Sequence, residues 1–233
     1  MSGFYSAGLF DVIPDSGTDH WQFEEGSGST AANRLASRPL DINGPTWQSD
    51  SNAREGFYLQ HDGVDDVAVN TADISHFSAV TEVSASVWIR SNDGDGDRSF
   101  LFSANDSGDL FGGSEWGLHI EGEFNDGVRG FAVGSSNSVT VETSTFPSGE
   151  WEHWGMRFRE NDTLDVFYNG SEIASETHSI SQTQGTASGF SVGGAHDGSQ
   201  RNLTGDTDDP WVGIGEFWTN ETFQEIYESH PRV

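Results

Sequence analysis

Two carboxylates at alternate positions are the feature of this sequence that comes nearest to an enzyme site. His119, Glu121 and Glu123 stand at every second position of residues 118–126. A strand points every second side chain to one face, and two carboxyl groups about 5.5 Å apart can act as nucleophile and acid in glycoside hydrolysis. The segment therefore suggests a hydrolase site, but we favour the simpler interpretation of an acidic strand that faces solvent.

Three aspartates in one predicted turn form the best candidate for a metal site. Asp62, Asp65 and Asp66 lie within five consecutive residues, and calcium prefers carboxylate oxygens as ligands. We predict these three residues as metal ligands, with calcium as the ion. The alternative is that Asp62, which precedes a glycine, only bonds to the backbone of its own turn.

A second acidic run resembles the start of a calcium-binding loop but breaks its pattern. Residues 93–97 alternate aspartate and glycine. Arg98 then occupies the position where an EF-hand needs glycine, and Ala104 replaces the glutamate at position twelve. An EF-hand is excluded, and we interpret the run as a solvated loop.

Eight tryptophans suggest the stacking platforms on which proteins bind sugar rings. Trp47 and Trp116 stand next to predicted loops and are the better candidates for ligand contact. Trp88 shares a predicted strand face with Arg90, and Trp116 opens the strand that carries His119 and Glu121. These six residues form the predicted ligand-binding set, with packing in the core as the alternative for Trp88. Packing is also our interpretation of Trp21, Trp151, Trp154 and Trp211.

Short alternating segments separated by polar turns must position these groups. Apolar residues alternate with polar ones in residues 154–158 and 164–168, around a turn at residues 160–162. Further strands are predicted at residues 57–59, 66–69, 84–90, 99–103, 116–121, 129–133, 138–142, 190–192 and 211–219. Residues 220–227 place Phe223, Ile226 and Tyr227 on one helical face behind a cap at Thr219 or Asn220. The pattern predicts an all-β, two-sheet antiparallel jelly-roll sandwich with a short C-terminal helix.

Charge narrows the possible environment and partners. The 233 residues carry a formal charge of −28, and all ten basic residues are arginine. At about 1 M salt the Debye length falls to roughly 3 Å, which screens such self-repulsion, so we favour a halophilic origin over an ordinary acidic secreted protein. No basic cluster is present to bind nucleic acid or an anionic membrane. Cysteine is absent, and we expect no segment that crosses a membrane.

The N-terminal segment is unusually apolar for this chain. Residues 1–17 contain Phe4, Tyr5, Leu9, Phe10, Val12 and Ile13. They predict either a first strand of the sandwich or an arm that docks on another protein. We therefore divide the chain into residues 1–19, an arm or first strand, and residues 20–233, one jelly-roll domain.

Five segments in order resemble the laminin G-like jelly roll of the concanavalin A-like lectin and glucanase superfamily. They are residues 21–28, 60–67, 84–89, 149–154 with 168–170, and 211–217 with 223–227. The closing strand of that family usually reads Ile-Asp-Glu, and Gly215 here replaces the aspartate, so the role of that aspartate in calcium ligation does not carry over. Enzymes of the superfamily would also have aspartate where Glu123 stands and a third carboxylate at Asn125 or Asp126. The resemblance thus implies the sandwich fold without the catalytic pattern.

The resemblance implies recognition of glycans or protein surfaces, and no enzyme activity is expected. We predict a virion component of a halophilic archaeal virus, such as a capsid decoration, spike or tail-fibre protein. Its expected partners are a glycan or host surface glycoprotein, other virion proteins bound through the N-terminal arm, and further copies of itself. The alternatives are an extracellular or cell-surface adhesion protein encoded by a cell, and a glycoside hydrolase that uses Glu121 and Glu123.

Overall fold

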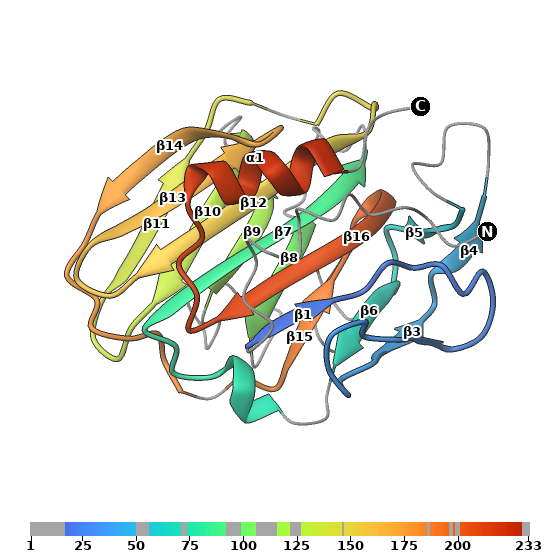
Figure 1. The fold of residues 1–233 in the computed structure, drawn as a ribbon, viewed down its shortest axis with the longest axis horizontal. Helices are drawn as coiled ribbons and strands as arrows, with labels where there is room; N and C mark the ends of the chain where they lie inside the picture. The colour runs from blue at the N-terminus through green and yellow to red at the C-terminus, as the bar shows by residue number, and fades with distance from the viewer. Residues whose placement is uncertain are drawn as a thin grey trace.

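The described residues form two antiparallel sheets of eight strands each (Figure 1). The structure is a computed structural model, and it describes residues 17–49, 56–70, 74–91, 99–105, 116–121, 127–145, 147–185, 187–195, 198 and 201–229. The predicted all-β jelly-roll sandwich with a short C-terminal helix is confirmed. The predicted N-terminal arm lies outside the described residues up to position 16, and β1 (Thr18–His20) spans the predicted boundary at residue 19.

The first sheet runs in the order β14, β13, β12, β7, β16, β5, β4, and β1 pairs with β16 beside β5. Besides β1, its strands are β4 (Thr46–Gln48), β5 (Tyr58–Asp62), β7 (Glu82–Arg90), β12 (Glu152–Arg159), β13 (Thr163–Tyr168), β14 (Ser171–Thr177) and β16 (Thr204–Ile214).

The second sheet runs in the order β11, β10, β9, β8, β15, β6, β3, β2. Its strands are β2 (Thr30–Ala31), β3 (Leu40–Asn43), β6 (Val67–Asn70), β8 (Ser99–Asn105), β9 (Trp116–Glu121), β10 (Gly127–Val133), β11 (Ser138–Glu142) and β15 (Gly189–Val192). A 3-10 helix, η2 (Ile74–Phe77), follows β6.

Strand β7 shows how one sequence serves two faces. Val83, Ala85, Val87 and Ile89 point into the main core between the sheets. The residues that alternate with them, Ser84, Ser86, Trp88 and Arg90, point to the outer face, as the two-residue period of a strand requires. On this outer face the aromatic Trp88 stands among the polar residues Ser84, Ser86 and Arg90. One part of the face can therefore pack against another element while another part stays open to solvent.

The C-terminal helix α1 (Asn220–Ser229) covers part of that outer face (Figure 1). Thr219 caps it, because the Thr222 amide donates to Thr219 Oγ1 over 3.2 Å. Phe223 and Ile226 are buried, and the Phe223 ring stacks on Phe167 of β13 with 3.8 Å between centroids. The predicted helix and its apolar face are confirmed.

The last strand corrects the sequence prediction. Instead of starting at residue 211 and running to 219, β16 begins at Thr204 and ends at Ile214. Its first half, with three aspartates and a proline, has the composition of a turn, but Asp206, Asp208 and Asp209 are buried. An irregularity in the pairing with β7 falls between Asp208 and Trp211. Polar partners within the fold, such as Arg90 for Asp206, make a buried strand of this acidic segment.

No helix in the described ranges is both long and apolar enough to cross a bilayer.

A glycine on β12 sets how closely α1 can approach. A Cβ on Gly155 would lie 2.6 Å from Phe223 Cε1. We expect Gly155→Ala to lower the free energy of unfolding by about 1–3 kcal/mol, because the added methyl group would push the helix off the sheet. Chemical denaturation at high salt measures this. Gly185→Ala is the control, since its nearest neighbour would be Ala79 Cβ at 3.3 Å, and equal effects of both substitutions would contradict the packing argument.

Candidate functional site

An open groove lies at one end of the outer face of the first sheet. It has a volume of about 730 Å³ and is named here the rim groove. Four strands supply it, because Thr46 of β4 is paired with Gln60 of β5, Gln60 with Asp206 of β16, and Asp206 with Arg90 of β7. Residues paired directly across antiparallel strands point to the same face. The four side chains therefore form one polar row across the sheet.

The remaining lining comes from the strand ends and loops around this row. The full lining is Gly44, Thr46, Gln60, His61, Asp62, Asp66, Arg90, Ser91, Gly149, Thr204, Gly205 and Asp206. Thr46, Gln60, Asp62 and Thr204 are exposed. The groove thus offers hydroxyl, amide and carboxylate groups to a ligand at the surface.

Arg90 is held firmly in the floor of the groove. Its Nε donates to Asp206 Oδ2 over 2.7 Å and its Nη2 donates to Tyr58 Oη over 3.0 Å. The guanidinium also lies 5.0 Å from the ring centroids of both Tyr58 and Trp151, a distance at which a cation attracts an aromatic face. Burial alone would lower the pKa of Arg90, but the hydrogen bond and charge of Asp206 outweigh it and raise the pKa. Arg90 is a fixed cation.

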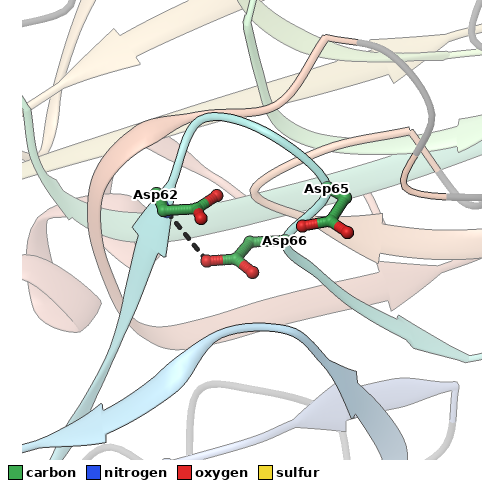
Figure 2. Close-up of side chains that lie close together, drawn as sticks. All are labelled: Asp62, Asp65 and Asp66. Atoms are coloured by element: carbon green, nitrogen blue, oxygen red, sulfur yellow. Dashed lines mark hydrogen bonds between the residues drawn. The ribbon is translucent and has the colours of Figure 1, made fainter.

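The three predicted metal ligands come together at the turn between β5 and β6. Figure 2 shows Asp62, Asp65 and Asp66 gathered on this turn, and one ligand oxygen from each lies within 4.8 Å of the others. The Val64 amide donates to Asp62 Oδ1 and the Asp62 amide donates to Asp66 Oδ2, both over 2.8 Å. Backbone bonds therefore set the positions of two of the three carboxylates.

This aspartate cluster, Asp62, Asp65 and Asp66, has the chemistry of a calcium site. One oxygen each of Asp62 and Asp66 and the whole Asp65 carboxylate remain for an ion. Burial, and then the charges of Asp62 and Asp65, raise the pKa of Asp66, against the lowering effect of the Asp62 amide. A cation would relieve that repulsion. Calcium takes six to eight oxygens, so water or a ligand would complete the shell.

The substituted position of the closing strand lies away from this cluster. Gly215 follows the end of β16, whereas Thr204 at its beginning pairs with Asp62. The aspartate that the resemblance would place at Gly215 is therefore at the opposite end of the strand, and its loss does not change the cluster.

His61 is a groove residue that the sequence did not reveal. Its side chain is buried, its Nε2 lies 2.9 Å from Thr207 Oγ1, and the ring packs against Gly193. Burial lowers its pKa to about 4, although the Asp66 backbone and the Asp62 charge act in the opposite direction. His61 is therefore neutral near pH 7. A histidine in a predicted turn motif gave no signal of this burial.

Most of the predicted ligand-binding set lies elsewhere. Of the five members whose side chains the structure describes, Arg90 alone lines the rim groove. The fully buried Trp88 stacks on Tyr227 of α1, with 5.5 Å between centroids. Trp116 is also fully buried, and its Nε1 donates to the Phe77 carbonyl over 3.1 Å. Neighbouring side chains enclose both rings, so neither Trp88 nor Trp116 exposes a face on which a sugar could stack.

The other predicted residues are also separate from the groove. His119 is fully buried between the rings of Phe100 and Phe131. Trp47 is partly exposed, and its Nε1 donates to the Gly28 carbonyl over 2.8 Å. Glu121 ends β9, while its side chain, Glu123 and the acidic run at 93–97 lie outside the described residues. The tryptophans predicted to pack, Trp21, Trp151, Trp154 and Trp211, are all buried.

Comparison with known families agrees with this architecture. Residues 62–212 match a laminin G family model that is described as the concanavalin A-like lectin/glucanases superfamily. The chain belongs to this superfamily. No curated protein matches the sequence significantly.

Solved structures with the same superfamily fold are distant in sequence. Domain 4 of the arabinanase AbnA from Geobacillus stearothermophilus, solved with arabinotriose, is 17% identical with a TM-score of 0.67, over 91% of this chain and 97% of that one. Trypanosoma rangeli sialidase with sialic acid is 13% identical with a TM-score of 0.66, over 92% and 33%. The binding domain of botulinum neurotoxin DC in complex with SialylT is 11% identical with a TM-score of 0.65, over 93% and 52%. The chain spans about a third of the sialidase, and these likenesses show the fold alone.

The buried His61 predicts a specific dependence of stability on pH. An unfolded chain protonates His61 near pH 6.5, but the folded chain does so only near 4. The stability that neutral His61 contributes is therefore complete above about pH 6.5 and is lost as the pH falls toward 4, by about 3 kcal/mol in all. We expect His61→Gln to lack this part of the pH dependence when unfolding is measured at pH 7.5 and 4.5. Parallel curves for the two proteins would rule it out.

Proposed function

We propose that this member of the concanavalin A-like superfamily is a non-catalytic glycan-recognition protein and that the rim groove is its binding site. The carrying observation is the polar row of Thr46, Gln60, Asp206 and Arg90 in an open groove of about 730 Å³. Sugar sites use a few fixed polar groups to orient hydroxyls. The exposed Gln60 and Thr204 side chains would form hydrogen bonds with sugar hydroxyls. Arg90, which its bond to Asp206 restrains, would keep the sugar in one orientation.

The carboxylates of the groove support binding more than hydrolysis. Asp206 accepts a hydrogen bond from Arg90, and Asp62 and Asp66 accept bonds from backbone amides of their own turn. A hydrolase needs one carboxyl as an acid and another free to attack or to activate water. Carboxylates that already accept hydrogen bonds are better suited to orient a bound ligand than to act as a nucleophile or a base. Superfamily structures solved with arabinotriose and with sialic acid make a glycan a reasonable ligand class for the same fold.

The setting that we propose for this recognition is the surface of a halophilic archaeal virus. The net charge of −28, with arginine in place of every lysine, supports an origin in a salt-rich environment. The apolar N-terminal segment supports attachment to other virion proteins, and attachment proteins gain avidity as oligomers. Capsid or tail genes beside the gene for this chain would support a virion component, whereas exported surface proteins there would favour a cellular adhesion protein.

Glycan binding through the rim groove is tested by removing one exposed amide. We expect Gln60→Ala to weaken binding of the best ligand on a glycan array by about three- to tenfold, because one or two hydrogen bonds are lost. Calorimetry at molar salt measures the affinity. Gln182→Ala, an exposed glutamine outside the groove lining, is the control. Equal affinities of both variants would place the site elsewhere, and turnover of the glycan would show an enzyme.

Calcium binding at the aspartate cluster is a separate prediction. We expect calcium at a hundredfold excess over its Kd to raise the Tm by about 5 °C or more, because only the folded chain assembles the cluster. Asp65→Asn should reduce this shift, since Asp65 is exposed and offers its carboxylate to the ion. Glu176→Gln, at the far edge strand β14, is the control. A calcium shift that survives in Asp65→Asn would contradict the assignment.

A further inference from the structure

Glu152 is a buried carboxylate that neutral groups hold in place. It is the first residue of β12 and is buried. Within the described part of the chain it forms no ion pair with an arginine, unlike Asp165 and Asp206. Instead, the hydroxyls of Ser148 and Tyr168 donate to its Oε1 over 2.7 and 2.9 Å, and the Ser148 amide donates to its Oε2 over 3.3 Å. Hydrogen bonds to a charged group are about twice as strong as neutral ones, so Glu152 is a firm anchor for the groups that donate to it.

A short loop, residues 148–151, leads into β12 and is named here the groove wall. The Gly149 amide donates to the Ser91 carbonyl over 2.8 Å. The Trp151 ring centroid lies 5.0 Å from the Arg90 guanidinium. Because Gly149, Ser91 and Arg90 all line the rim groove, the wall supports the groove at two points, one at Ser91 and one at Arg90.

Ser91 extends this connection to the exposed side of the groove. Its Oγ donates to the Thr204 carbonyl over 2.6 Å, and the exposed Thr204 is one of the residues that we expect to bind a sugar. Hydrogen bonds and the short chain between them therefore join Glu152 to the groups that would meet a ligand. Glu152 is not itself part of the groove lining, so it acts on a ligand only through the wall.

Apolar packing holds little of the wall in place. Ser148 and Glu150 are exposed. Gly149 has no side chain, so Trp151 is the only residue of the wall that buries one. A segment with few buried apolar contacts opens locally at a low cost in free energy. The position of the wall therefore depends on its hydrogen bonds, and two of these join Ser148 to Glu152.

We propose that Glu152 is a positioning residue of the rim groove, whose carboxylate holds the wall in the conformation that binds a glycan. This inference rests on the proposed glycan-binding function. By fixing the start of the wall, Glu152 keeps Gly149 against Ser91 and Trp151 against Arg90. When the anchor is lost, the wall opens more often. The apparent affinity then falls with the fraction of molecules whose wall is closed.

Ser148→Ala tests the anchor at an exposed position, where folding is not at risk. The substitution removes the hydroxyl that donates to Glu152. We expect the Gly149 amide to exchange its hydrogen about tenfold faster or more, because a bond to a charged group is lost. We expect the Kd of the best glycan to rise about threefold or more. Hydrogen exchange and calorimetry at molar salt measure the two effects, and Ser148→Thr, which keeps a hydroxyl, should restore both.

Glu152→Gln tests the carboxylate itself. An amide accepts hydrogen bonds with only one of its two terminal atoms, so at least one of the three bonds is lost and the others lose their charge. We expect changes in exchange and in Kd of the same direction as in Ser148→Ala. Gly155→Ala is the matched control, because it destabilises the packing of α1 and does not touch the wall. It should lower the stability but leave the Kd unchanged.

The outcomes separate this inference from the proposed function. Faster exchange of the Gly149 amide with an unchanged Kd in Ser148→Ala would overturn the positioning role and leave glycan binding intact. Unchanged exchange in both Ser148→Ala and Glu152→Gln would also overturn it, since the wall would then not depend on Glu152. An equal rise of the Kd in Gly155→Ala would show an effect of general stability and refute the inference. Binding of no glycan by the wild-type protein would overturn the proposed function, and the positioning role with it.

Discussion

The pairing of β16 with β7 in the middle of the first sheet is the constraint on which the rest of the structure depends. The register aligns Asp206 with Arg90 at one end and Ile214 with Val83 at the other. One face of both strands fills the core between the sheets. The opposite face is divided in two, because α1 covers its aromatic part and leaves its polar end open. The rim groove is this open end.

The part of the outer face under α1 and the part at the rim groove differ in how much apolar side-chain surface they can bury. Near α1, Gly155 lets Phe223 approach the sheet, and the Trp211, Trp218 and Phe167 rings complete an apolar cluster. At the groove, Thr46, Gln60 and Thr204 are exposed and present hydroxyl and amide groups to solvent. Burial of apolar area drives the first arrangement, whereas the cost of removing polar groups from water keeps the second open.

Electrostatics follows a similar division. Buried carboxylates such as Asp19, Asp165 and Asp206 are each paired with an arginine, as a buried charge requires. In the aspartate cluster at the β5–β6 turn, Asp62 and Asp66 accept hydrogen bonds from backbone amides instead. Solved structures that are less than 20% identical share the fold, so function must be argued from such local differences.

The sequence by itself determined the fold class, the β12–β13 hairpin, the capped helix and the aspartate cluster. Each of these depends on local periodicity or on residues within one turn, which neighbours along the chain decide. Only the tertiary structure decided that residues 204–209 belong to a largely buried strand and that Trp88, Trp116 and His119 are enclosed. It also decided that Arg90 on β7 lies directly opposite Asp206 on the neighbouring strand β16. The reason is that burial and cross-strand pairing join residues more than 100 positions apart, such as Arg90 and Asp206. An alternating pattern shows which side chains share a face, but not whether that face meets water, a helix or a ligand.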